Sequence, residues 1–231
     1  MANIDISPWG YLVLWIALVG AGVVLSGCSA GSGMTGEEPP HHTRSGFRNL
    51  NGPAEEKGKS WWRFFMMRFS TDYVDHFAEA DQVPVVPVDA DRLKSPVEAQ
   101  ATWLGHATFL IQVAGANILT DPMFSERASP VSWLGPKRYT KPALGVDELP
   151  SIDYVVLSHN HYDHLDLNSI EAIGNDALWL IPLRNGHLLE SVGVTRYIEL
   201  DWWESHEVNG WRFTATPVQH WSARGINDRF E

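Results

Sequence analysis

Residues 159–164 are the part of this chain best suited to metal chemistry. They read His-Asn-His-Tyr-Asp-His and directly follow an apolar stretch. Side chains two positions apart in an extended segment point the same way, so His159 and His161 can converge on one ion. Asp163 and His164 would then turn toward a second point, at the start of a helix. Imidazole and carboxylate ligands suit Zn²⁺, with Fe or Mn as alternatives, and the spacing therefore predicts a metal site.

The composition narrows the possible functions. The chain has 231 residues, of which 44% are hydrophobic, so it is long enough to form a folded core. A formal charge of −11 argues against a nucleic-acid partner held by a broad basic surface. The one cysteine, Cys28, excludes intrachain disulfides and cysteine-rich zinc sites. The 10 histidines are therefore the candidate metal ligands.

The elements that must position these side chains alternate between strands and helices. Predicted strands cover residues 101–113, 117–120, 153–158 and 178–181, and predicted helices cover residues 167–173 and 186–192. Asp166 is the expected cap of the first helix. Asp121 is expected at a strand end facing a loop, because the proline after it cannot continue a ladder. Asn209-Gly210, between residues 203–208 and 211–218, predicts a hairpin that His220 follows.

The first thirty residues have the pattern of an export signal. Tyr11–Leu25 is a 15-residue apolar run, shorter than the roughly 20 residues that a membrane span needs. It leads into Leu25-Ser26-Gly27-Cys28, which resembles the lipobox of bacterial lipoproteins. That resemblance implies a signal segment over residues 1–27, lipid attachment at Cys28 and a membrane-anchored lipoprotein facing the periplasm. The alternatives are an uncleaved N-terminal anchor with a chance cysteine, and a cytoplasmic location.

Two segments connect this signal to the folded part. Residues 28–58 are rich in Gly, Ser, Pro and charge and are predicted to form a tether. His41 and His42, within it, are expected to be solvated. Trp61–Phe69 is interpreted as a helix packed on the domain, with a position at a lipid headgroup layer as the alternative. Residues 59–231 are expected to form one domain.

Several motifs together resemble a known family. The pattern His-x-His-x-Asp-His resembles the signature of the metallo-β-lactamase fold superfamily. The flanking motifs are similar to those of its N-acylphosphatidylethanolamine phospholipase D-like branch. They are Gly46–Asn49, Trp103–Thr108, Ile118–Pro122, Gly135–Arg138, Ser158–Asp166 and Pro217–Trp221. The resemblance implies an α/β fold, a four-layer αββα sandwich of two similar halves, with the site at the strand ends.

The resemblance also assigns roles by position. The implied ligands of two Zn²⁺ ions are His159, His161 and His220 for the first, and Asp163 and His164 for the second. Asp163 and His164 are also the implied catalytic residues. Asp121 would support the metal-binding loop without touching an ion, and His106 would line the pocket or be structural. Tyr162 would pack, with substrate contact as the alternative.

The activity that the resemblance implies is hydrolysis. Two adjacent zinc ions lower the pKa of a shared water enough to supply hydroxide near neutral pH. That hydroxide would cleave the phosphodiester of an N-acylphosphatidylethanolamine-type lipid, giving phosphatidic acid and an N-acylethanolamine. The expected partners are a phospholipid or another small molecule, and a membrane reached through the lipid anchor, without nucleic acid. The alternatives are a lactonase or other hydrolase on the same fold, and an inactive membrane-tethered fragment.

The family also places a metal-bridging Asp and a last His ligand beyond the counterpart of His220. Only 11 residues follow His220, and Asp228 is too close to it to match that Asp. The second half of the sandwich is therefore expected to be incomplete, and the protein to be truncated at its C-terminus relative to the family. On this expectation the protein binds zinc weakly and hydrolyses little.

Overall fold

The computed structural model describes residues 39–44, 46–52 and 86–225. The predicted signal segment with Cys28, the Trp61–Phe69 helix and Asp228 lie outside these residues. Among the residues that are described, no helix is both long enough and apolar enough to cross a membrane. The described residues from Pro40 onward belong to a single compact unit.

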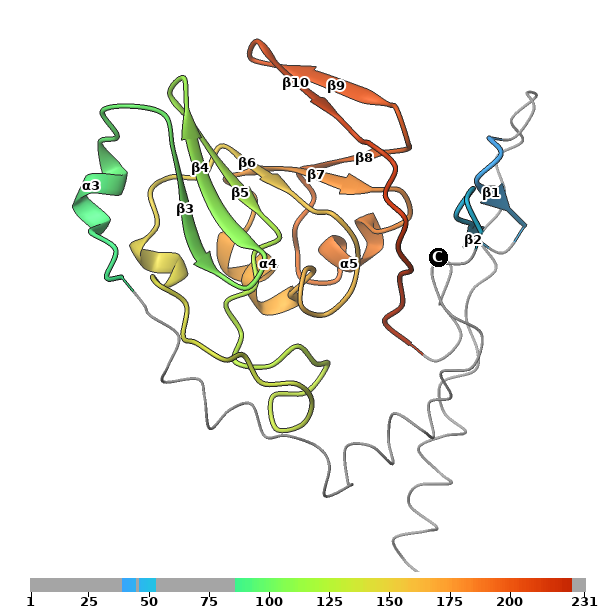
Figure 1. Cartoon of the computed structure of the whole chain (residues 1–231), viewed down its shortest axis with the longest axis horizontal. Helices are drawn as coiled ribbons and strands as arrows, with labels where there is room; N and C mark the ends of the chain where they lie inside the picture. Colours follow the sequence, from blue (N-terminus) through green and yellow to red (C-terminus); the bar gives the residue numbers. More distant parts are fainter. Residues whose placement is uncertain (1–38, 45, 53–85, 226–231) are drawn as a thin grey trace, which may run out of the picture. The chain divides into compact units, whose positions relative to one another are not determined.

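A six-stranded mixed sheet lies at the centre of this unit (Figure 1). Its strands, in spatial order, are β3 (Gln100–Gly105), β4 (Thr108–Val113), β5 (Ala116–Thr120), β6 (Tyr154–Val156), β7 (Leu178–Pro182) and β8 (Tyr197–Leu200). The first three pair antiparallel, whereas β5 to β8 run parallel. Because parallel strands end at the same edge of a sheet, the segments after β5, β6 and β8 meet there. The predicted α/β fold is confirmed.

Two apolar clusters hold other elements against the sheet. Helices α4 (Leu167–Ile173) and α5 (Gly186–Glu190) cover one face, where Trp179 of β7 is fully buried. On the opposite face, the hairpin of β9 (Ser205–Val208) and β10 (Trp211–Thr214) packs on a second cluster. Figure 1 shows the helices and this hairpin on opposite sides of the sheet. The described residues thus form a helical layer, a sheet and a smaller two-stranded sheet.

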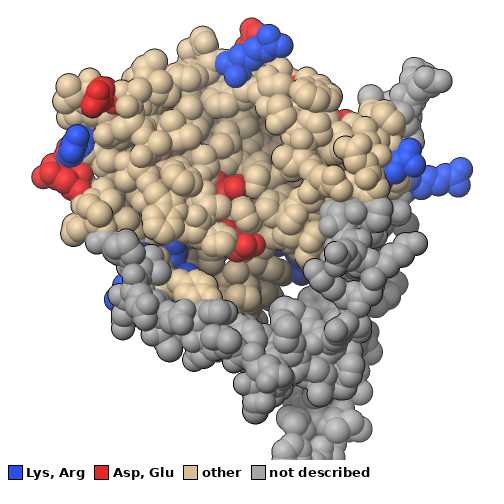
Figure 2. Space-filling view, in the orientation of Figure 1, with Lys and Arg blue, Asp and Glu red and all other residues tan. Residues whose placement is uncertain are grey.

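Short elements complete the described part of the protein. They are β1 (His42–Thr43), β2 (Gly46–Phe47), α3 (Ala90–Lys94) and a 3₁₀ turn at Val146–Glu148. β1 and β2 pair antiparallel and form a short hairpin. On the face drawn in Figure 2, Lys and Arg lie toward the edges, whereas acidic side chains lie both at the edges and near the centre.

Local signals predicted two of these elements closely. Helix α4 begins after Asp166 and ends at Gly174, as predicted, although the side chain of Asp166 makes no cap hydrogen bond. Asn209 and Gly210 both have positive φ, 49° and 80°, as a type I′ hairpin turn requires. Both arms of that hairpin are shorter than predicted, and the first begins only after the backbone turns at Trp203 (φ 68°).

Candidate metal centre

Asp121 ties the end of β5 to the loop that follows β6. Its Oδ1 accepts a hydrogen bond from the Ser158 N–H (2.7 Å), and its Oδ2 accepts one from the Ser158 hydroxyl (2.8 Å). The same Oδ2 lies 2.9 Å from His164 Nδ1. Asp121 is buried and has φ 36°, a conformation that Asp tolerates better than most residues. The structure therefore places Asp121 at a strand end, in contact with both Ser158 and His164.

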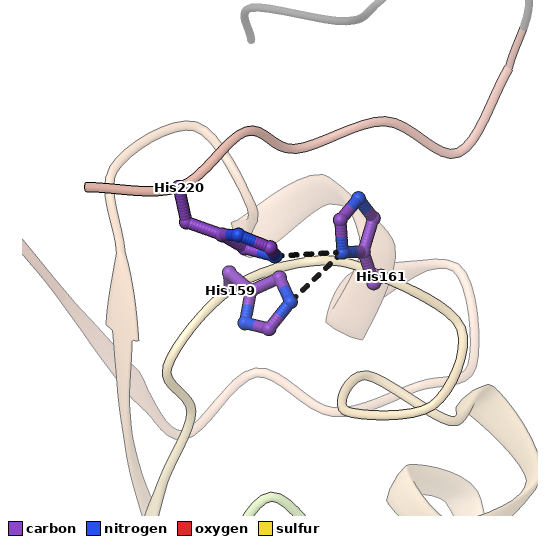
Figure 3. A group of neighbouring side chains, drawn as sticks. All are labelled: His159, His161 and His220. Carbon is purple, nitrogen blue, oxygen red and sulfur yellow. Dashed lines mark hydrogen bonds between the residues drawn. The ribbon is translucent and has the colours of Figure 1, made fainter. Parts of the chain in front are cut away.

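Three imidazoles converge beside this loop. His161 Nδ1 lies 2.9 Å from His159 Nε2 and 3.3 Å from His220 Nε2 (Figure 3). His220 comes from the segment after β10, so the fold brings it to the loop after β6 from a distant part of the sequence. Tetrahedral Zn²⁺ with bonds of about 2.0–2.1 Å holds its ligand nitrogens roughly 3.3 Å apart. The three nitrogens can therefore ligate one ion together.

Hydrogen bonds orient the rings of His159 and His164. Ser158 Oγ lies 2.9 Å from His159 Nδ1, and Asp121 Oδ2 lies 2.9 Å from His164 Nδ1. Because the hydroxyl of Ser158 donates to Asp121, it accepts from His159. The proton then resides on Nδ1 of both rings, and each Nε2 keeps its lone pair for a ligand. This is the outer hydrogen bonding that metal-binding histidines use.

A second group adjoins the first. His106 Nε2 lies 2.9 Å from Asp163 Oδ2, and His164 Nε2 lies 3.6 Å from the same oxygen. The rings of His159 and His164 are 4.1 Å apart between centroids, so the two groups are neighbours. His106 follows β3 with φ 49°, and non-Gly residues in such conformations cluster at functional sites. The structure thus brings His106 into the second group, among its potential ligands.

Two histidines of the first group have lowered pKa values, which favours the binding of a cation. Burial and the neighbouring His164 lower the pKa of His159 to about 4. Burial and His220 also lower the pKa of His161. Both imidazoles are therefore neutral at pH 7, and a neutral imidazole is the form that ligates metals.

In the second group, the pKa of one histidine is raised and that of the carboxylate is lowered. Burial lowers the pKa of His164, but the hydrogen bond and the charge of Asp121 outweigh it, so that pKa lies above its usual value. Burial raises the pKa of Asp163, but the hydrogen bond from His106 and the charge of His164 outweigh it and lower that pKa. Asp163 is therefore ionised at neutral pH, and a proton competes with a metal at His164.

We expect the two groups to lose a bound metal at different pH values. A raised pKa keeps His164 protonated to higher pH, whereas His159 stays neutral down to about pH 4. Because ligand protonation opposes binding, acidification should release metal from the second group first. Dialysis of the Co²⁺-loaded protein at stepwise lower pH, followed by its visible absorption, checks this order. Simultaneous loss, or earlier loss from the first group, would contradict it.

Tyr162 and Arg224 hold the outside of the loop. Tyr162 donates from its hydroxyl to the Arg224 carbonyl (2.9 Å), and the Arg224 guanidinium lies 4.0 Å from the centre of its ring. Arg224 Nη1 also donates to the carbonyls of Asn160 (2.9 Å) and Leu165 (2.7 Å). Sequence reasoning gave no role to Arg224 or Ser158, because neither carries a spacing signal. Tyr162 packs, as predicted.

Two cavities adjoin the groups. One, of about 690 Å³, is lined by His106, Asp163 and aromatic side chains that include Trp103, Tyr139 and Trp221. A smaller one, of about 150 Å³, has His159 and His220 in its wall, with Asn49 and Asp201. Asn49 donates from Nδ2 to the His220 carbonyl (2.8 Å), so the β1–β2 segment also supports the first group.

The expectation that His41 and His42 are solvated is wrong. His41 is buried, and both imidazoles hydrogen-bond to Asp201 at 2.7 and 2.9 Å. His41 also stacks on Trp202, with ring centroids 4.2 Å apart. A linker composition does not reveal this contact, because Asp201 lies 160 positions away from His41.

Comparison with known proteins then identifies the family. A profile described as "Beta-lactamase superfamily domain" matches residues 116–230, which hold five of the six residues of the two groups. The chain belongs to the metallo-β-lactamase superfamily. This confirms the resemblance stated above and accounts for two adjacent ligand groups at the ends of the parallel strands.

Three relatives illustrate the similarity. N-acyl-phosphatidylethanolamine-hydrolyzing phospholipase D 1 of Caenorhabditis elegans is 39% identical over 158 residues, 63% of this chain and 44% of its own length. The mitochondrial N-acyl-phosphatidylethanolamine-hydrolyzing phospholipase D of Saccharomyces cerevisiae is 38% identical over 152 residues, 63% of this chain and 32% of its own length. A metal-dependent hydrolase of Aeropyrum pernix is 39% identical over 75 residues, 32% of this chain and 26% of its own length. This metallo-β-lactamase superfamily protein therefore spans less than half of each relative.

Proposed function

We propose that this protein is a zinc-dependent hydrolase that cleaves the phosphodiester of N-acylphosphatidylethanolamine-type lipids. The observation that carries the proposal is the pair of ligand groups at one sheet edge, with His159 and His164 in ring contact at 4.1 Å. Bound Zn²⁺ would supply a water of lowered pKa and positive charge beside the phosphate. The phospholipase D activity for which the nematode and yeast relatives are named supports the choice of substrate.

The side chains of the protein would hold this chemistry in place. His159, His161 and His220 would hold the first zinc, and His164 with Asp163 would hold the second. Asp121 fixes the ring of His164, and His106 holds the Asp163 carboxylate. In the reaction, the oxygen of a water bonds to phosphorus and the bond from phosphorus to the ethanolamine oxygen breaks. The N-acylethanolamine leaves with a proton, and phosphatidic acid remains.

The surroundings of the larger cavity suit an amphipathic lipid. Lys137 and Arg138 line it together with aromatic side chains, so a phosphate and an acyl chain both find complementary groups there. Trp133 and Leu134, on the same loop, are 75% and 58% exposed. Exposed aromatic and aliphatic side chains beside basic ones favour contact with a lipid surface.

A substrate assay tests the proposed reaction. We expect the full-length protein, supplied with Zn²⁺, to release N-acylethanolamine from N-acylphosphatidylethanolamine vesicles. The release should be abolished in His161→Ala and retained in His187→Ala, which removes an exposed histidine of α5. The same protein is also assayed on a panel of lactones. Mass spectrometry of the products from the lipid and from the lactones identifies the substrate. Hydrolysis of lactones alone would overturn the phospholipase D-like proposal.

We also propose that Cys28 carries a lipid that anchors the protein to a bacterial membrane, facing the periplasm. The support is the apolar run Tyr11–Leu25 followed by Leu25-Ser26-Gly27-Cys28. Radiolabelled palmitate should enter the wild-type protein expressed in bacteria and should not enter Cys28→Ala. Absence of label in the wild-type protein would contradict the anchor.

A further inference from the structure

A third group of ligand atoms lies apart from the metal centre. His41 Nε2 is 2.7 Å from Asp201 Oδ1, and His42 Nε2 is 2.9 Å from Asp201 Oδ2. One ligand atom from each of the three residues lies within 4.8 Å of the others. Asp201 directly follows β8, as Asp121 directly follows β5, so both carboxylates stand at the edge where parallel strands end. In open α/β sheets this edge is where ligands bind.

Asp201 supplies a negative charge to this group. Burial raises the pKa of Asp201, but hydrogen bonds from His41 and the Trp202 N–H outweigh it and lower that pKa, so the carboxylate is ionised. The side chain of Asp201 is only 14% exposed, and its ion-pair partners within the described residues are the two histidines. The imidazoles of His41 and His42 lie 4.6 Å apart between centroids, so the three side chains form one compact group.

We propose that His41, His42 and Asp201 bind a divalent transition-metal ion, zinc being the first candidate. Two imidazoles and one carboxylate are a ligand set that zinc takes in proteins, with a fourth position left for water. Both histidines turn Nε2 toward the carboxylate of Asp201, and the stacking of His41 on Trp202 at 4.2 Å fixes the orientation of that ring. The ion would displace the Nε2 protons, so that each neutral ring carries its proton on Nδ1, and it would neutralise the carboxylate and bind all three side chains.

Such an ion would fasten the β1–β2 hairpin to the end of β8. Asn49 follows this hairpin by two residues, and its side chain donates to the His220 carbonyl at 2.8 Å. Phe47 and Asn49 line the 150 Å³ cavity together with Asp201 and His220. The third group therefore holds a wall of the cavity beside the first group and supports the backbone of His220.

The test separates this site from the metal centre by removing the latter. The full-length protein with both His161→Ala and His164→Ala is titrated with Co²⁺ and followed by visible absorption and elemental analysis. We expect this background to retain about one Co²⁺ ion per molecule at the remaining three-ligand site. Adding His42→Ala or Asp201→Asn should abolish that binding, whereas adding His187→Ala should not. None of these readouts depends on activity, so the proposed function can fail without affecting this result.

Two further measurements make the result decisive. Circular dichroism shows whether each variant folds, and His42→Ala decides if Asp201→Asn does not fold, because the His42 side chain is 23% exposed. Hydrogen exchange of the Arg48 amide, which bonds the His41 carbonyl at 2.8 Å, should slow on adding metal and should not slow in His42→Ala. Absence of Co²⁺ from the background, or binding that neither variant changes, would overturn the proposal. If His42→Ala or Asp201→Asn lowers the melting temperature without changing the amount of bound metal, the three residues only form an ion pair. That result would also overturn the proposal.

Discussion

His161→Ala is expected to remove metal from the first group and to abolish hydrolysis. His161 Nδ1 is the atom that both other imidazoles approach, at 2.9 and 3.3 Å, so its loss leaves His159 and His220 without their shared partner. Changing an outer partner of a ligand typically costs about 10- to 100-fold in metal affinity. Removing one of three ligands should cost more. Calorimetric titration of Zn²⁺ into the variant and the wild-type protein measures the difference.

The control for this variant is His187→Ala, which also deletes one imidazole. His187 lies on the exposed side of α5, outside all three ligand groups. It should bind zinc as the wild type does. Equal zinc affinity in His161→Ala and the wild type would contradict the assignment of the first group.

Asp121→Asn is expected to weaken the second group directly, whereas the first group is affected only through Ser158. Asp121 Oδ2 accepts from the Ser158 hydroxyl and from His164 Nδ1. An amide nitrogen in that position donates, so His164 would accept through Nδ1 and carry its proton on Nε2, the atom that faces Asp163. A protonated Nε2 cannot ligate. Metal affinity of the second group and turnover should therefore fall by about 10- to 100-fold.

The backbone at this position makes the substitution a clean test. Asn tolerates the φ of 36° at Asp121 as well as Asp does, so no strain is added. Asp166→Asn is the matched control, since Asp166 is also buried and accepts from Ser125 Oγ at 2.9 Å, outside the ligand groups. Metal titration and steady-state kinetics of both variants give the comparison. Equal losses in both variants would show a general effect of a buried carboxylate and contradict the role of Asp121.

The sequence predicted the elements whose signals are local. The bounds of helix α4 follow from Asp166 and Gly174, and the β9–β10 turn follows from Asn209-Gly210. The division of residues 101–113 into β3 and β4 was missed. Gly105, with φ 129°, was the available signal, since an isolated glycine in a strand pattern indicates a break or bulge.

The difference between local signals and contacts over long sequence distances also explains which parts of the site were predicted. Residues 159–164 are close in sequence, so their spacing alone indicates a metal site. His106 meets Asp163 across 57 positions, and His42 meets Asp201 across 159 positions. Periodicity does not report such pairs, because they depend on strand order and on which segments end at one sheet edge. The part played by Ser158 follows from backbone placement after β6 and carries no residue-type signal.

An anomalous difference map recorded at the zinc edge, from crystals of the full-length protein soaked in excess Zn²⁺, tests the central claim most directly. We predict a peak about 2.0–2.1 Å from each of the three facing nitrogens of His159, His161 and His220. Zinc found elsewhere on the protein, with no peak among these three side chains, would contradict the account.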